Sequence, residues 1–238
     1  MSSVCDSTPH IGCKLCQSHH KSLFGVLSDK EQILVDNVKT CTKYKKGQVL
    51  FHEGTRPMGV FCISTGRVKV YRMGLDGKEQ IIKISAAGDL LGYKALISDQ
   101  HYLLSGEALE DCLVCFIPKD DFLELLKPGS EFYMNLLKAV CEEHGTIASK
   151  ITEMAQLSVR QRLALSLLML NDTYGLEQDV NGDIQINLSR EDLANIVGTA
   201  TESLIRLLNE FKKDGLIETH GRKIEVKNPE GLLRASKR

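Results

Sequence analysis

The chain of 238 residues has the composition of an ordinary folded protein and almost no net charge. It is 42% hydrophobic and 26% charged, with a formal charge of −1 at pH 7. A chain of this length can form two domains with a core each, whereas near-neutrality excludes a protein that coats nucleic acids generally. The longest apolar run, 163–170, is interrupted by Ser166 and is too short for a membrane span, so we expect no membrane partner.

The N-terminal arm, residues 1–27, is rich in cysteine and histidine, and its weak pattern favours a loop or short helices. It holds no secretory signal, so the chain's eight cysteines indicate a cytoplasmic location, where thiols stay free, bind metal or respond to redox state. Cys13 and Cys16 form a C-x2-C pair close to His19 and His20, and the polar arm offers them no core to fill. Four other cysteines are expected to be small buried apolar residues: Cys41, Cys62, Cys112 and Cys141.

In the domain predicted at 28–118, residues 41–118 alternate short β-branched and aromatic runs with glycines, which is typical of a small antiparallel barrel or sandwich. A helix is predicted first, at 28–38, where Ser28 and Glu31 have the spacing of a capping box. The runs 66–71 and 76–84 predict one hairpin of the sheet. We therefore expect an antiparallel β-roll domain.

Residues 119–158 are predicted to be a helical region that carries a dimer contact. Apolar side chains recur there at steps of four and three residues for about three heptads, the spacing of a coiled coil. A helix lying on its own core would show a wider apolar stripe, so we expect a homodimer through a parallel helix pair. His144 is interpreted as a polar interruption, with a pH or ligand switch as the alternative. We call these positions the seam: Tyr133, Leu137, Val140, His144, Ile147, Ile151 and Met154.

The last domain, 159–238, is predicted to bind DNA. It begins with a helix at 160–175, followed at 180–188 by a hairpin or short strand with an Asn-Gly turn. Residues 187–226 then predict a helix, a tight turn, a second helix and a basic two-stranded hairpin. This succession is a winged helix-turn-helix, whose second helix enters the major groove of double-stranded DNA.

Capping residues and charge support this interpretation. The first helix is expected to begin at Ser189, the turn to lie at Gly198, and the second helix to begin at Thr199 with Glu202 as its capping partner. From position 199 to the end there are nine Lys/Arg and six Asp/Glu, an excess of three positive charges, which is typical of a DNA contact face. The predicted DNA contacts are Ser189, Thr199, Thr201, Glu202, Ile205 and Arg206.

A β-roll, a long dimerising helix and a winged helix-turn-helix, in this order, resemble the CRP/FNR family of bacterial transcription regulators over about 27–227. The similarity is most specific in the segments 88–96 (GDLLGYKAL), 114–118 (VCFIP) and 188–208. It implies an α+β fold with a cyclic-nucleotide-binding-like domain. It also implies a homodimer that binds palindromic DNA and contacts RNA polymerase.

Within this family a Glu and an Arg on the recognition helix contact TGA-type half-sites, and the matching residues here are Glu202 and Arg206. Arginine can donate two hydrogen bonds to guanine, and glutamate can accept one from the cytosine amino group. The FNR-like pattern has a serine where this chain has Ile205, which cannot donate a hydrogen bond but can pack on a thymine methyl. The exact half-site therefore stays open.

The roll lacks the residues with which family members hold cyclic AMP. Tyr93 stands where those members have a glutamate, and residues 100–108 contain no arginine for the cyclic phosphate. A buried phosphate without a cation would lack its strongest hydrogen bonds. We therefore predict no cyclic AMP site of the usual kind.

The oxygen-sensing FNR branch holds a 4Fe–4S cluster on three N-terminal cysteines and one cysteine of the roll, and the resemblance implies such a cluster here. Cys13, Cys16 and Cys115 match three of these positions, whereas the third N-terminal cysteine aligns with Ser22. Cys112 is a poor substitute, because three residues along a strand reverse the direction of a side chain. The candidates for the missing ligand are Cys5, His19 and His20.

Two other interpretations of these cysteines stay open. A zinc site suits a mixture of Cys13, Cys16, Cys115 and a neighbouring histidine. A thiol–disulfide switch between the C-x2-C pair and Cys115 needs no metal.

The sequence thus predicts a cytoplasmic, homodimeric DNA-binding regulator that senses through its roll or through a metal or redox centre on the arm. The alternative is a metal- or ligand-binding sensor that acts through protein interaction instead of DNA. An enzyme is not expected, because no nucleophile–base pair, metalloprotease motif or phosphate-binding loop is present.

Overall fold

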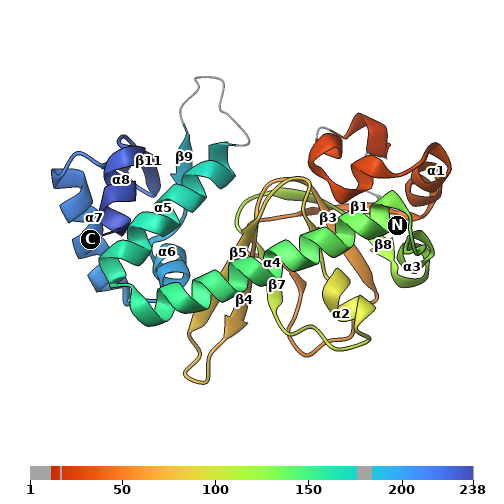
Figure 1. The fold of residues 1–238 in the computed structure, drawn as a ribbon, viewed down its shortest axis with the longest axis horizontal. Coiled ribbons are helices and arrows are strands. Elements are labelled where there is room, and N and C mark those ends of the chain that lie inside the picture. The colour runs from red at the N-terminus through yellow and green to blue at the C-terminus, as the bar shows by residue number, and fades with distance from the viewer. Residues whose placement is uncertain (1–11, 17, 176–183, 238) are drawn as a thin grey trace, which may run out of the picture. The chain divides into compact units, whose positions relative to one another are not determined.

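The computed structural model describes residues 12–16, 18–175 and 184–237 (Figure 1). It combines antiparallel sheets with helices, which confirms the predicted α+β class. No helix in the described ranges is long and apolar enough to cross a bilayer. Contacts between Cα atoms divide the described residues into unit 1, within Met1–Arg72 and Lys83–Glu143, and unit 2, within Met73–Ile82 and His144–Arg238.

The β-roll consists of two four-stranded sheets, in the orders β1-β8-β3-β6 and β2-β7-β4-β5. Neighbouring strands run antiparallel, as predicted. The predicted hairpin is confirmed, because β4 and β5 are neighbours in the second sheet. The strands are β1 (Thr40–Tyr44), β2 (Val49–Phe51), β3 (Gly59–Thr65), β4 (Val68–Met73), β5 (Glu79–Ser85), β6 (Leu90–Leu91), β7 (Ser105–Ala108) and β8 (Cys112–Pro118).

Alternation along β3 gives the first sheet two apolar faces, because successive side chains of a strand point to opposite sides. Phe61 and Ile63 pack into a core shared by strands of the two sheets. Val60 and Cys62 pack into a second core, which the first sheet shares with helices and with the N-terminal arm. The side chains of the first sheet that point into the second core are therefore the ones that face the arm.

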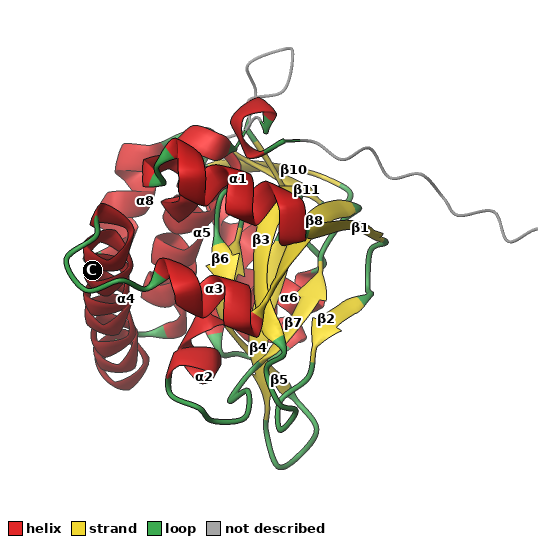
Figure 2. Cartoon of the chain, turned by 90° about the vertical axis from the view of Figure 1, so that its right-hand side faces the viewer, coloured by secondary structure: helices red, strands yellow, loops and turns green. Residues whose placement is uncertain are grey.

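Two short helices cover this second face, as Figure 2 shows. α1 (Asp29–Val38) begins after Ser28, and the capping box between Ser28 and Glu31 is confirmed. α3 (Lys119–Leu125) follows β8 and contacts both β8 and α1. Their buried side chains, among them Val35 and Phe122, belong to the second core.

The long helix α4 (Glu131–Gln156) buries only its first turns in this chain. Phe132 and Leu136 belong to the second core, and the Phe132 ring stacks on that of Phe24 from the arm with centroids 5.6 Å apart. The seam is mostly exposed further along the helix, and Ile151 exposes 65% of its surface. The dimer contact stays a prediction that such an uncovered apolar stripe supports.

Unit 2 contains a third, three-stranded sheet among four shorter helices and the last part of α4. β11 pairs with β10 and with β9, so the sheet order is β10-β11-β9. The predicted helix at 160–175, the strand near 186 and the two-stranded hairpin are confirmed, whereas the Asn-Gly turn lies outside the described residues. The elements are α5 (Val159–Gly175), β9 (Gln185–Asn187), α6 (Arg190–Val197), α7 (Thr201–Lys213), β10 (Ile217–His220), β11 (Lys223–Val226) and α8 (Pro229–Ser236).

In unit 1, a hydrogen bond and an ion pair to one carboxylate of α4 connect the segment 88–96 to this helix. α2 (Tyr93–Ile97) starts after Gly92, and the buried Tyr93 donates a hydrogen bond of 3.2 Å from its hydroxyl to Glu143. Lys94 forms an ion pair of 2.5 Å with the same carboxylate. Burial opposes the charge of Glu143, but the contacts with Lys94 and Tyr93 outweigh it and lower the pKa of this carboxyl.

This lowered pKa predicts a pH-dependent contribution to stability. A carboxyl whose pKa is lower in the folded state stabilises the fold above pH 4.5, the ordinary value for glutamate, and loses this contribution as the pH falls. We expect Glu143→Gln to lower the midpoint of urea unfolding at pH 7 and to differ less from the unsubstituted chain at pH 4, where part of this contribution is lost. Circular dichroism at both pH values measures this, and an equal difference at both would contradict it.

Candidate DNA-binding helix and cysteine pocket

The first helix of the helix-turn-helix is fixed by the residues at its two ends. Ser189 precedes α6, and its hydroxyl accepts a hydrogen bond of 2.9 Å from the Asp192 amide. Gly198 follows α6 with a φ of 71°, in the left-handed region that favours glycine. The predicted helix start at Ser189 and turn at Gly198 are therefore confirmed.

The predicted start of the second helix at Thr199 is wrong. α7 begins at Thr201, its N-cap is Ala200, and no side chain caps it. The amides of Gly198 and Thr199 both donate to the carbonyl of Ala194, at 2.8 and 3.1 Å. The amide of Thr199 is thus still bonded to the end of α6, as in a Schellman-type stop, and is not free to donate to Glu202 as a capping box requires.

Arg162 of α5 holds the turn between the two helices. Its guanidinium donates to the carbonyls of Val197 at 3.0 Å and Gly198 at 3.2 Å. It also donates to the carbonyl of Leu157 at 2.8 Å, just after α4. Only a planar guanidinium offers donors in several fixed directions at once, so a single side chain joins three segments of unit 2.

The second helix, α7, has one buried and one exposed face. Glu202, Ile205 and Arg206 are exposed, and Ile205 exposes 44% of its surface. Arg206 makes no hydrogen bond or ion pair with any residue that the structure describes, so its guanidinium is available to a partner. The buried face packs into unit 2 through Leu204, Leu207, Leu208 and Phe211.

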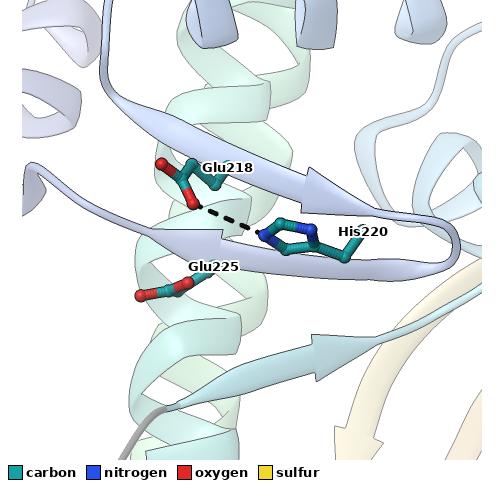
Figure 3. A group of neighbouring side chains, drawn as sticks. All are labelled: Glu218, His220 and Glu225. Atoms are coloured by element: carbon teal, nitrogen blue, oxygen red, sulfur yellow. Dashed lines mark hydrogen bonds and ion pairs between the residues drawn. The ribbon is translucent and has the colours of Figure 1, made fainter.

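The hairpin of β10 and β11 carries a group of polar side chains that sequence reasoning missed. Figure 3 shows Glu218, His220 and Glu225 close together. Their potential metal-ligand atoms lie within 4.8 Å of one another. Nε2 of His220 lies 3.4 Å from Oε2 of Glu218. Lys227 forms ion pairs with both glutamates, so the protein itself offsets their charge and we assign no metal to this group.

Three cysteines form a row across the first sheet of unit 1. Cys115 on β8 lies directly opposite Cys41 on β1 and directly opposite Cys62 on β3. Directly opposed residues of antiparallel strands point to the same face, so the three sulfurs share the face that meets the arm. Cys41 and Cys115 are joined by a disulfide.

The arm places two more cysteines over this row. Its described part is a succession of three 3-10 helices, as the prediction of short helices requires: η1 (Cys13–Leu15), η2 (His19–Lys21) and η3 (Leu23–Val26). The Cys13 amide donates a hydrogen bond of 2.8 Å to Asp36 of α1, and the Cys16 sulfur lies 3.2 Å from the Ser64 hydroxyl of β3. Five cysteines therefore line one pocket: Cys13, Cys16, Cys41, Cys62 and Cys115.

One of the candidates for the fourth ligand lines the pocket, and so does Ser22. His19 lines the pocket, whereas His20 is exposed and is not part of the lining. Cys5 lies outside the described residues. The Ser22 hydroxyl, at the position of the missing family cysteine, lies 3.7 Å from the sulfur of Cys62.

The interpretation of four cysteines as core residues is only partly right. Cys112 is buried between the two sheets, as predicted, and does not line the pocket. Cys62 packs against the second core, as predicted, and also lines the pocket, whereas Cys41 is disulfide-bonded. Cys141 is exposed, because α4 buries little beyond its first turns. The predicted exchange partner of Cys115 also differs, since the structure pairs it with Cys41 and not with the C-x2-C pair.

The pocket sulfurs differ in their tendency to ionise. Burial raises the pKa of the Cys62 thiol to about 12 and also raises that of Cys13, against the effect of a hydrogen bond of 3.0 Å from the Lys39 ammonium. Burial opposes ionisation of Cys16 too, but hydrogen bonds from Ser18 and Ser64 outweigh it and lower its pKa. The Lys39 side chain is only 3% exposed, so a buried cation faces the thiols.

Comparison with known proteins identifies the two parts of the chain. A cyclic nucleotide-binding domain matches residues 41–128, and a Crp-like helix-turn-helix domain matches residues 161–235. The solved structure of FixK2 from Bradyrhizobium japonicum is 22% identical with a TM-score of 0.73, and it covers 83% of this chain and 97% of its own. That of a CooA mutant from Carboxydothermus hydrogenoformans is 25% identical with a TM-score of 0.71, over 90% and 95% of the two chains.

Curated relatives match over nearly the whole length. The anaerobic regulatory protein of Haemophilus influenzae is 28% identical over 94% of this chain and 87% of its own. The fumarate and nitrate reduction regulatory protein of Yersinia pestis is 27% identical over 93% of this chain and 89% of its own. With a cyclic nucleotide-binding domain followed by a Crp-like helix-turn-helix, and with regulators and not enzymes as relatives, the chain belongs to the CRP/FNR family of transcription regulators.

Proposed function

We propose that the protein is a cytoplasmic, sequence-specific regulator that binds palindromic DNA as a homodimer. The observation that carries the proposal is the exposed face of α7, where Glu202, Ile205 and Arg206 lie together on a helix that follows a tight turn. A helix in this position of a helix-turn-helix enters the major groove and contacts base edges with its N-terminal residues. RNA polymerase is the expected protein partner from the family.

Each exposed side chain suits a different base. The guanidinium of Arg206 can donate two hydrogen bonds to a guanine, and the carboxylate of Glu202 can accept one from a cytosine. Ile205 can pack on a thymine methyl. Thr199 and Thr201 stand at the turn, where hydroxyls commonly contact phosphates. The hydroxyl of Ser189 already donates to Asp192, so we expect Ser189 to act mainly as the cap of α6.

Pairing of α4 with its copy would set the spacing of the two recognition helices. Recognition helices about 34 Å apart can enter successive major grooves on one face of the duplex. The exposed seam supports such pairing, because an apolar stripe on a long helix is normally covered in the working protein. A signal received in unit 1 would then act on DNA binding by changing this spacing.

Once the Cys41–Cys115 disulfide is reduced, the donor set of the pocket fits a metal or redox centre. Cys13, Cys16 and Cys115 line one pocket with a buried lysine, and cysteine thiolates are the usual ligands of iron–sulfur clusters and a common set for zinc. When bound, such a group would supply sensitivity to oxidants or a fixed structural link. The arm would bind it from one side and β8 from the other.

The alternative function, a sensor that acts only through proteins, makes a different prediction about salt. DNA binding through several phosphates releases counterions, so the affinity must fall steeply as salt rises. Titration of a labelled palindromic TGA-type duplex at several salt concentrations tests this. Weak binding with no dependence on salt would contradict the DNA-binding proposal.

We expect Arg206→Ala to weaken binding by about 1–3 kcal/mol, and only where the half-site carries its guanine. Duplexes with each base pair replaced in turn measure this, because the substituted protein should no longer distinguish the base at that position. Arg234→Ala is a suitable control, since Arg234 is an exposed arginine on α8 outside the recognition helix. A uniform loss over all duplexes would show that Arg206 contacts the backbone only.

We expect Ile151→Asp to shift the protein from dimer to monomer, because it buries a carboxylate in the seam without a partner. Sedimentation velocity over a range of concentrations measures the shift. Leu103→Asp is a matched control, because Leu103 and Ile151 are both 65% exposed and only Ile151 belongs to the seam. Equal dissociation of both variants would contradict the role of the seam.

A further inference from the structure

We propose that Cys62 supplies the fourth thiolate of a metal centre whose other ligands are Cys13, Cys16 and Cys115. The inference deepens the sensor part of the proposed function and rests on it. It replaces the histidines and Cys5 considered from the sequence with a cysteine from the middle of the sheet. The ligand class is a metal that prefers four thiolates, either an iron–sulfur cluster or a single zinc ion.

The position of Cys62 carries the proposal. It lies directly opposite Cys115 on the neighbouring strand, so both sulfurs leave the sheet on the same side. Its sulfur lies 3.7 Å from the hydroxyl of Ser22, the position at which the arm itself offers only an oxygen. The Cys62 thiolate can therefore take the ligand position that a cysteine at position 22 would otherwise occupy.

The other candidates fit less well. Cys112 belongs to the opposite face of the sheet and packs between the two sheets. His20 is exposed and does not line the pocket. Cys41 lines the pocket but lies on the far side of Cys115 from Cys62, since the sheet order is β1-β8-β3. His19 lines the pocket and is the remaining rival.

One of the proposed ligands already accepts a hydrogen bond from a cation. The Lys39 ammonium, almost fully buried, donates to the Cys13 sulfur at 3.0 Å and pairs with Asp36 at 2.5 Å. Four thiolates on a divalent ion or a cluster leave net negative charge, and hydrogen bonds from a cation to sulfur stabilise it. Metal binding itself deprotonates a coordinated thiol, so burial does not prevent Cys62 from serving as a ligand.

Metal binding and the disulfide exclude each other, because both use the sulfur of Cys115. A dithiol reductant frees it by passing two electrons and two protons to the Cys41–Cys115 disulfide, which yields two thiols while the reagent becomes a cyclic disulfide. The whole pocket is a cavity of about 30 Å³, room for about two water molecules. The sulfurs of Cys13, Cys16 and Cys62 do not form a group within 4.8 Å of one another among the described residues, so metal binding requires the side chains that line the pocket to move.

The test is metal loading of the full-length protein after reduction with dithiothreitol under anaerobic conditions. One portion is incubated with ferrous iron and sulfide, and another with zinc. Iron, sulfide and zinc per chain and the absorption spectrum are then measured after desalting. We expect the unsubstituted chain to retain one centre and Cys62→Ser to lose at least nine tenths of it. Absorption of the thiolate–iron bands distinguishes a cluster from zinc, and either metal supports the assignment.

Rescue separates a lost ligand from a damaged fold. In the Cys62→Ser background, Ser22→Cys should restore most of the metal, because the two side chains are neighbours. Four single variants should keep their metal: Cys5→Ser, His19→Ala, Cys41→Ser and Cys141→Ser. Retention of metal by Cys62→Ser, loss of metal by His19→Ala, or an unsubstituted chain that binds neither metal would overturn the assignment. Binding to the palindromic duplex is measured separately, so a failure of the ligand assignment is distinguishable from a failure of DNA recognition.

Discussion

The pairing of β8 with both β1 and β3 is the constraint on which the sensor half of this protein depends. It places Cys41, Cys115 and Cys62, which are far apart in the sequence, in one row across three strands. Alternation along the strands then sends all three sulfurs to the face that meets the arm, while Cys112 goes to the other face. A slip of one residue in either pairing would remove a sulfur from the pocket.

The same principle of fixed backbone geometry governs the DNA-binding half, by different means. A glycine in the left-handed region ends α6, and a single guanidinium binds the carbonyls around the turn. The apolar face of α7 is fully committed to the core of unit 2. The buried face alone fixes the orientation of α7, so the exposed residues are not needed to hold the helix in place. Their identity can therefore vary with the DNA half-site.

Local sequence signals predicted most of this fold. Capping residues located α1 and α6, heptad spacing located α4, and glycine-punctuated runs located the strands, because each signal lies within a few residues of what it determines. The local capping pattern predicts a start of α7 at Thr199, whereas the helix begins at Thr201 and the amide of Thr199 is bonded to Ala194. The pocket is not predicted by these local signals. Cys41 and Cys62 looked like core residues because the register between distant strands cannot be derived from periodicity.

The disulfide between Cys41 and Cys115 closes a loop of 74 residues that contains most of the roll. In the chain-entropy account, such a closure removes about 4 kcal/mol of freedom from the unfolded chain. A metal centre that takes the sulfur of Cys115 would give up this closure but tie the arm to the sheet instead. The ring of Phe24, which belongs to the arm, stacks on Phe132 at the start of α4. With a metal centre, the arm segment that packs on the first turn of α4 would be tied to the sheet through the metal. With the disulfide, packing alone holds that segment against α4.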